Sequence, residues 1–156
     1  MDATQPFLFS PVGSVWIQIK DADPSGVALF RRHYSFKPRK RGPQKQPHFC
    51  GPGEKMVLIT PCARALFVWR KFKSMDSQTG VNCAVFRNEG AGLASALIAA
   101  AMELAWARWP GERLYTYVNG AKVKSRNPGY CFIRAGWRKC GSTKRGLLIF
   151  DASPCQ

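Results

Sequence analysis

The sequence predicts a mixed α/β fold: a mainly antiparallel sheet with one strand–helix–strand crossover and helices on both faces. Two observations carry this prediction. Short segments rich in aromatic and β-branched residues recur along the 156-residue chain, as is typical of strands. Between two of these segments, Leu93, Leu97, Ala101 and Leu104 recur at helical spacing in an alanine-rich stretch. A helix of this length between two strands usually makes them parallel neighbours.

The N-terminal half supplies most of the expected antiparallel sheet. Asp23 and Pro24 predict a helix start, because aspartate caps a helix and proline suits its first position; the helix runs towards Arg32. A first strand is expected at residues 14–19, before this helix. After it, strands at 54–60 and 65–70 are expected to form a central antiparallel hairpin, and a third strand follows at 81–86.

The C-terminal half closes the sheet. The long helix ends at Trp109-Pro110-Gly111, and an aromatic strand follows at 113–119. Asn127 and Pro128 predict a short helix that runs to Ala135 and stops at Gly136. A closing hairpin is expected from residues 137–141 and 145–150.

The charge is strongly positive and clustered. With 24 basic and nine acidic residues, the formal net charge is +15. Residues 31–45 hold seven basic residues and residues 113–145 hold nine, and neither segment contains an acid. Two such segments on one face would form a groove for a phosphate backbone, so nucleic acid is the first expected partner. Tyr34 and Phe36 lie among the first cations, a pairing suited to holding single-stranded or flipped nucleotides.

Length and composition predict one domain over residues 1–156, with a basic loop or arm at 31–53. The sequence shows no secretory signal and no membrane-spanning stretch, which predicts a cytoplasmic protein without a membrane partner. The six cysteines are then expected to be reduced thiols. No CxxC pair occurs, so a structural zinc site is not expected.

A glycine turn joins the strand at 81–86 to the long helix. Arg87, Gly90 and Gly92 form an R-x-x-G-x-G pattern at this junction. Glycines let the backbone turn tightly and approach a pyrophosphate, and the helix start points free N–H groups and a positive dipole end at the same spot. The pattern therefore predicts a phosphate-bearing donor, although a plain turn explains it too. Glu89, within the turn, is unfavourable for a phosphate.

Three blocks carry a resemblance to a known fold: residues 86–94, 114–118 and 127–137. Together they resemble the acyl-CoA-binding half of the GNAT superfamily of N-acetyltransferases. The resemblance implies a GNAT-like sheet, a donor-binding core at 81–137 and Tyr130 near the leaving thiol. It implies that the donor, an acyl-CoA such as acetyl-CoA, is held by Arg87, Asn88, Gly90, Ala91, Gly92, Ser95 and Asn127.

A narrower resemblance spans residues 32–137. The blocks 32–35, 80–90, 115–119 and 127–132 are similar to the Mom family of bacteriophage DNA-modification proteins. That family converts adenine in DNA to an N6-carbamoylmethyl derivative and so shields the DNA from restriction. The resemblance implies a transferase acting in a bacterial host on a flipped adenine of double-stranded DNA. It does not decide whether the donor is an acyl-CoA or a glycine-derived group on an aminoacylated carrier. It also does not decide whether the enzyme uses an iron ion or whether it forms a homodimer.

The candidate site residues follow from the residue types and charge pattern together with the two resemblances. The catalytic candidates are His33, Tyr34, Asn82 and Tyr130. His33 is an acid, base or metal ligand on this interpretation, and otherwise a surface histidine. The residues expected to contact DNA are Arg31, Arg32, Lys37, Arg39, Lys40, Arg41, Lys122, Lys124 and Arg126. Two other functions stay open: an N-acetyltransferase for a protein or small-molecule amine, and a DNA-binding module without enzymatic activity.

Overall fold

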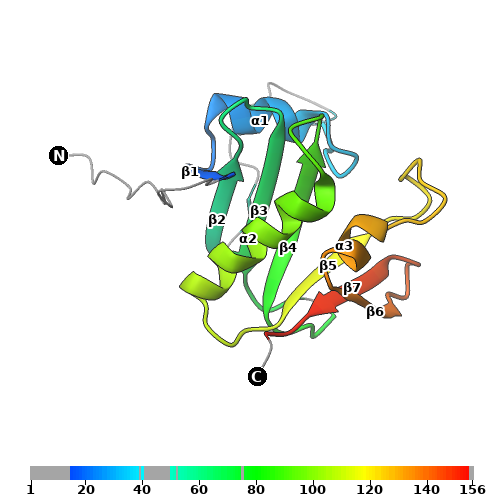
Figure 1. Ribbon diagram of the computed structural model, residues 1–156. Coiled ribbons are helices and arrows are strands. Elements are labelled where there is room, and N and C mark those ends of the chain that lie inside the picture. Colours follow the sequence, from blue (N-terminus) through cyan, green and yellow to red (C-terminus); the bar gives the residue numbers. More distant parts are fainter. Residues whose placement is uncertain (1–14, 39, 41–49, 52, 75, 155–156) are drawn as a thin grey trace.

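The computed structural model describes residues 15–38, 40, 50–51, 53–74 and 76–154 (Figure 1). Arg39 and Arg41, two of the expected DNA contacts, lie outside the described residues. Seven strands form one sheet in the order β1-β2-β3-β4-β5-β7-β6. The strands are β1 (Ile17–Ile19), β2 (Glu54–Ile59), β3 (Ala65–Lys71), β4 (Val81–Asn88), β5 (Leu114–Val118), β6 (Arg138–Ser142) and β7 (Leu148–Ala152). The helices are α1 (Pro24–Arg31), α2 (Ala94–Arg108) and α3 (Tyr130–Arg134).

The sheet is mixed and mainly antiparallel, as the sequence predicts. Every neighbouring pair is antiparallel except β4 and β5, which are parallel and joined through α2. These two strands pair only from Val81–Cys83 to Leu114–Thr116. Beyond that point β4 continues to Asn88 and β5 to Val118 without pairing with each other, and the two strands diverge (Figure 1).

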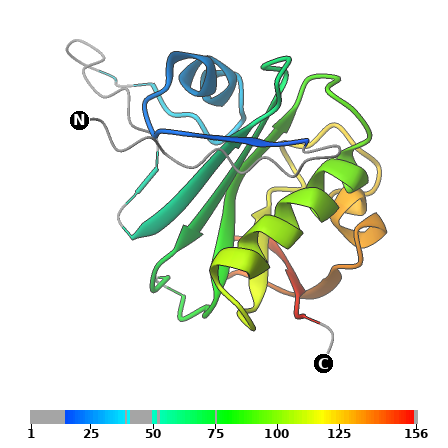
Figure 2. The same ribbon diagram turned by 60° about the vertical axis from the view of Figure 1, so that its left-hand side comes forward.

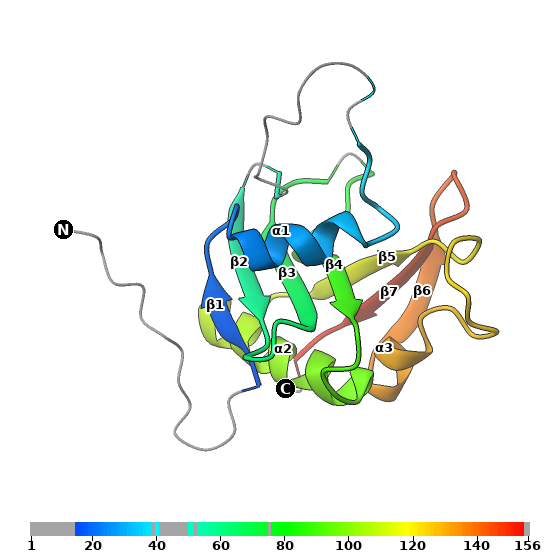
Figure 3. The same cartoon turned by 90° about the horizontal axis from the view of Figure 1, so that it is seen from above.

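Helices cover both faces of the sheet, which confirms the expected layering (Figures 2 and 3). Leu29 of α1 packs in a core cluster with Val57, Leu66 and Val68 on one face. The larger cluster on the other face includes apolar residues of α2 and Phe132 of α3. Two indole groups also fasten α2 to the sheet: Trp16 Nε1 donates to the Leu97 carbonyl and Trp69 Nε1 to the Ala101 carbonyl, each at 2.9 Å.

The predicted helix starts have different outcomes. Asp23 caps α1, and its Oδ1 accepts the Ser25 N–H at 3.0 Å. The prediction that Asn127 caps the third helix was wrong, because α3 begins at Tyr130. Its capping residue is Gly129, whose φ of 82° suits glycine and where a Cβ would overlap the Phe150 ring. Residues 127–129 therefore form a turn that carries the chain over Phe150 before the helix starts.

No helix within the described residues is long and apolar enough to cross a membrane. This agrees with the absence of a spanning stretch in the sequence. The long helix α2 has 15 residues, which is short of the roughly 20 that a span requires.

Candidate functional site

A cavity of about 570 Å³ lies where β4 and β5 separate. Five segments line it: the chain just after α1, β4 from Cys83 onwards, the end of β5, the loop that follows β5, and α3. Diverging strands leave backbone groups and side chains free to face a cavity, and ligand sites in α/β sheets often form at such openings. The cavity is therefore the candidate functional site.

The floor of the cavity is the last paired position of the two strands. Cys83 of β4 lies opposite Thr116 of β5, and Thr116 Oγ1 donates to the Cys83 carbonyl at 3.0 Å. Burial raises the pKa of the Cys83 thiol, and burial likewise raises that of Cys131 across the cavity in α3. Both thiols are protonated at neutral pH, so they line the floor as packed groups and not as nucleophiles.

His33 stands at the wall beside β4 in one defined tautomer. The backbone N–H of Ser35 donates to its Nδ1 at 3.2 Å, and the Ser35 hydroxyl lies 2.7 Å from the same nitrogen. An accepting Nδ1 places the ring proton on Nε2. Burial, and then the charge of Arg87, lower the pKa of His33 to about 4, although the backbone of Phe86 favours the charged form. The ring is therefore neutral at pH 7, and its one lone pair is already engaged by Ser35.

Tyr34 forms the aromatic surface of the same wall. Its ring centre lies 4.3 Å from that of His33 at an interplanar angle of 30°, and 37% of the residue is exposed. Burial of the remainder raises the pKa of its hydroxyl, which the backbone of Asn119 partly offsets. A neutral imidazole beside a half-exposed phenol ring offers a surface on which a planar base can stack.

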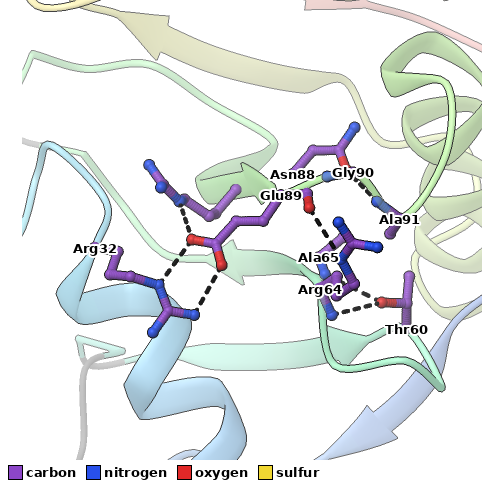
Figure 4. Close-up of polar contacts among 9 residues, drawn as sticks. Arg32, Thr60, Arg64, Ala65, Asn88, Glu89, Gly90 and Ala91 are labelled. Atoms are coloured by element: carbon purple, nitrogen blue, oxygen red, sulfur yellow. Dashed lines mark hydrogen bonds and ion pairs between the residues drawn. The ribbon is translucent and has the colours of Figure 1, made fainter.

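Glu89 ties the end of α1 to the end of β4 at the cavity rim (Figure 4). Its two carboxylate oxygens accept from Nε and Nη2 of Arg32, both at 2.8 Å. Arg87 Nε donates to the same carboxylate at 2.8 Å. The hydrogen bond from Arg32 is the main reason that the pKa of Glu89 falls to about 2. Glu89 thus positions two guanidinium groups at the rim and offsets part of their charge.

The glycine turn after β4 is held by its own side chains (Figure 4). Asn88 Oδ1 accepts the N–H groups of Gly90 at 3.1 Å and Ala91 at 3.0 Å, and Asn88 Nδ2 donates to the Gly92 carbonyl at 2.8 Å. The Glu89 N–H donates to the Arg64 carbonyl at 2.7 Å.

Arg64 also holds the turn from the other side. Its Nε donates to the Glu89 carbonyl at 3.1 Å, and Thr60 Oγ1 in turn accepts the Arg64 N–H at 3.3 Å. Three consecutive amides that a diphosphate would need, those of residues 89–91, are therefore already bonded within the chain. A pyrophosphate at this turn would therefore have to bond the N–H groups at the start of α2 and not those of residues 89–91.

The cavity gathers some of the expected site residues and leaves others apart. It is lined by Arg32, His33, Tyr34, Arg87, Asn88, Lys122 and Lys124. Asn82 is buried below the strand opening, and Tyr130 is 54% exposed at the start of α3; neither lines the cavity. The same holds for Gly90, Ala91, Gly92, Ser95 and Asn127. Arg31, Lys37, Lys40 and Arg126 are exposed outside its lining.

Among the residues of this site that the sequence prediction missed, three carry polar groups that hydrogen-bond there: Ser35, Thr116 and Tyr117. Thr116 and Tyr117 line the cavity, and Tyr117 donates its hydroxyl to both carboxylate oxygens of Asp76, at 2.6 and 2.7 Å. Strand alternation could have shown that Thr116 and Tyr117 face opposite sides of the sheet. No sequence signal reveals that the two sides meet at an opening.

A metal site has no support from this geometry. The described residues contain no group of three or more histidine, cysteine, aspartate or glutamate side chains that could hold an ion. The His33 lone pair is engaged by Ser35, so His33 would have to move its ring proton from Nε2 to Nδ1 before it could bind an ion through Nε2.

Comparison with known proteins adds no assignment to this geometry. No model of a protein family matches the chain. No curated protein matches it either.

Proposed function

We propose that this chain is a DNA-modifying transferase with a GNAT-like core, which adds a small group to N6 of an adenine flipped out of duplex DNA. A carbamoylmethyl-type product would protect the DNA from restriction in the cytoplasm of a bacterial host. Support for the fold comes from the strand order and from the parallel β4–β5 pair that diverges beyond Cys83 and Thr116. Support for the family comes from the sequence blocks at 32–35, 80–90, 115–119 and 127–132.

The observation that carries the proposal is the composition of the cavity. Four basic residues line it together with the His33–Tyr34 ring pair: Arg32, Arg87, Lys122 and Lys124. This combination suits a nucleotide, because its phosphates bind cations and its base stacks on an aromatic ring. The volume of about 570 Å³ falls within the roughly 300–1,000 Å³ of small-molecule sites.

In the proposed reaction the flipped base stacks on Tyr34, while Lys122 and Lys124, both exposed on the loop after β5, contact the flanking phosphates. For a carbamoylmethyl product, a bond forms between N6 and the methylene carbon of the transferred group, and the bond between that methylene carbon and its carrier breaks. The proton lost from N6 leaves with the departing carrier group. The donor is a glycine-derived group that leaves its carrier through the methylene carbon, because transfer through the carbonyl carbon would give an N6-acyl product instead.

Mass spectrometry of nucleosides tests the proposal. Plasmid DNA co-expressed with the wild-type protein should yield a modified deoxyadenosine of increased mass, and Tyr34→Ala should abolish it. A matched pair of charge reversals at exposed lysines outside both basic segments, Lys20→Glu with Lys73→Glu, should leave the yield unchanged. Unmodified adenine in the presence of soluble wild-type protein would refute the proposed function.

One observation favours a second function, an N-acetyltransferase acting on a protein or small-molecule amine. The parallel strands diverge directly before a helix that starts with an R-x-x-G-x-G turn. Calorimetric titration with acetyl-CoA separates the two functions. Tight binding and acetylation of peptides without DNA affinity would favour this alternative. DNA binding with no modified base would instead indicate a DNA-binding module without enzymatic activity.

A further inference from the structure

Three polar side chains lie side by side on neighbouring strands, away from the cavity lining. Arg70 of β3 is opposite Asn82 of β4, and Asn82 is opposite Tyr115 of β5. Directly opposite residues in a sheet project from the same face. The three side chains therefore form a row on the face that α1 partly covers, where Val57 and Val68 of the smaller core cluster also lie.

Each member of this row has a buried polar atom without a hydrogen bond: Arg70 Nε, Asn82 Oδ1 and the Tyr115 hydroxyl. Only 7% of Asn82 is exposed, and Tyr115 is completely buried. The Ser74 hydroxyl is near enough to Tyr115 to favour its ionised form, which opposes the rise that burial causes in the pKa of Tyr115. The hydrogen bonds of that hydroxyl, however, are made with Asp76 and Gln78, and not with the Tyr115 hydroxyl.

Native proteins bond almost all buried polar groups. Three adjacent exceptions therefore indicate a missing partner at this row.

The charge at this row is also uncompensated. The Arg70 guanidinium lies 3.4 Å from the centre of the Phe72 ring and makes no ion pair within the described part of the chain. The ionisable groups that interact with it are Cys50 and Tyr115. Burial raises the pKa of Cys50 to about 12 and raises that of Tyr115. Both are neutral at pH 7, so a half-buried cation whose Nε is fully buried stands next to two uncharged groups, which is unfavourable without an anion.

The acidic side chains of the described residues are placed elsewhere. Those with ion pairs bond other cations: Asp21 bonds Lys55, Glu89 bonds Arg32 and Arg87, Glu112 bonds Lys71, and Asp151 bonds Arg113 and Arg138. Asp76 accepts from Ser74 and Tyr117. An anion for Arg70 is thus not supplied by these acids.

We propose that Arg70, Asn82 and Tyr115 form a binding site for a small carboxylate. A planar guanidinium edge binds a carboxylate through two parallel hydrogen bonds, and the Tyr115 hydroxyl adds a third donor. The side-chain amide of Asn82 supplies a fourth donor when it is turned over, so that its NH2 group takes the place of its oxygen. The hydrogen-bond partner decides which of the two orientations is correct. This inference rests on the row itself and not on the proposed DNA function.

The row is close to the cavity. The Tyr115 ring meets the Tyr117 ring edge to face at 5.7 Å, and Tyr117 lines the cavity. A carboxylate bound at Arg70 would therefore lie behind the Tyr117 wall. A ligand carrying such a group has a second anchoring point next to the candidate site.

Formate is the probe for this site. The melting temperature of the full chain is measured against sodium formate, with ionic strength held constant by sodium chloride. We expect a rise of about 5 °C or more when formate reaches 100 times its Kd. Tyr115→Phe, which removes only the hydroxyl, and Arg70→Met should lose most of this rise. Arg108→Met is the matched control, because its guanidinium also lies over an aromatic ring, that of Trp109 at 5.0 Å.

Three results would overturn the carboxylate site. The first is no rise in melting temperature, and the second is an equal rise in wild type and Tyr115→Phe. The third is a crystal structure grown with formate in which a water molecule alone bridges the three side chains. If Arg70→Met does not fold, the Nε–Hε resonance of Arg70 in the wild type replaces it and should shift on addition of formate. Formate binding without any DNA modification would refute the proposed function and leave this site intact.

Discussion

The hydroxyl of Thr116 should hold the floor of the candidate site together. It is buried, with 3% of the residue exposed, and its Oγ1 donates at 3.0 Å to the Cys83 carbonyl at the last paired position of β4 and β5. Thr116→Val keeps the shape of the side chain and removes the donor. The Cys83 carbonyl then loses this hydrogen bond just where the strands diverge.

The expected loss of stability follows from that single bond. Leaving a buried acceptor unsatisfied costs about 1–3 kcal/mol. Burying a methyl group in place of a hydroxyl offsets part of this, so we expect a net loss of about 1–2 kcal/mol for Thr116→Val. For a chain of 156 residues, each kcal/mol corresponds to about 2–4 °C, so the melting temperature should fall by about 2–8 °C.

Urea unfolding and differential scanning calorimetry measure this change. The same substitution at an exposed position, Thr79→Val, is the matched control and should change stability by less than about 0.5 kcal/mol. An unchanged urea slope would show that the loss lies in the folded state. If Thr116→Val is as stable as wild type, the hydrogen bond to Cys83 does not hold the strand opening and this reasoning fails.

Three further predictions concern charge at the site. Nitrogen NMR should show that His33 is neutral at pH 7, carries its proton on Nε2 and titrates near pH 4. Because the pKa of His33 in the folded protein lies below the ordinary 6.5, the free energy of unfolding should fall as the pH drops from 6.5 towards 4. His33→Gln should remove this pH-dependent component. Glu89→Gln should lower the melting temperature at pH 7 and remove stability that is present above pH 4.5 and lost towards pH 2. Reversing both Lys122 and Lys124 to glutamate should weaken DNA binding and reduce its salt slope by about 2.

Each of these predictions has a matched control. Ser35→Ala keeps the N–H that bonds His33, so the tautomer should persist; a ring proton found on Nδ1 would contradict the assignment. Glu103→Gln on the exposed side of α2 should not change acid stability, and equal effects at both glutamates would rule out the Arg32–Arg87 anchor. The reversals at Lys20 and Lys73, which are exposed and lie outside both basic segments, should leave the salt slope almost unchanged. An equal effect there would mean that net charge, and not the loop after β5, governs binding.

Local patterns were enough to predict the elements of the fold. Helical spacing from Leu93 to Leu104 and the β-rich segments on either side predicted the parallel β4–β5 pair, because a crossover helix leaves few other arrangements. Asp23 and Pro24 predicted the start of α1. The start of α3 was misplaced at Asn127, because its true position depends on contact between Gly129 and Phe150, which are far apart in sequence.

The candidate site was only partly predictable. His33, Tyr34 and Arg87 were singled out by residue type and motif, and they do line one cavity. Asn82 was expected at the same opening, but it does not line the cavity. The two strands are still paired at Asn82 and separate only after Cys83, a position that the sequence did not reveal. A bulge between Val68 and Trp69 shifts the register of β3 against β4, and this shift places Arg70 opposite Asn82. No single segment contains that information.

The sequence by itself determined the mixed sheet and the basic segments; the contacts with a nucleotide that it suggests stay a prediction. Tertiary structure alone decided what the glycine turn does. An Asn-x-Gly turn that bonds its own amides and one that leaves them free for a phosphate have the same residues at the same spacing. Only the folded chain brings Arg64 and Arg32 to residues 88–91, and there the turn acts as an anchor for α1 and β4, with its amides at 89–91 already bonded.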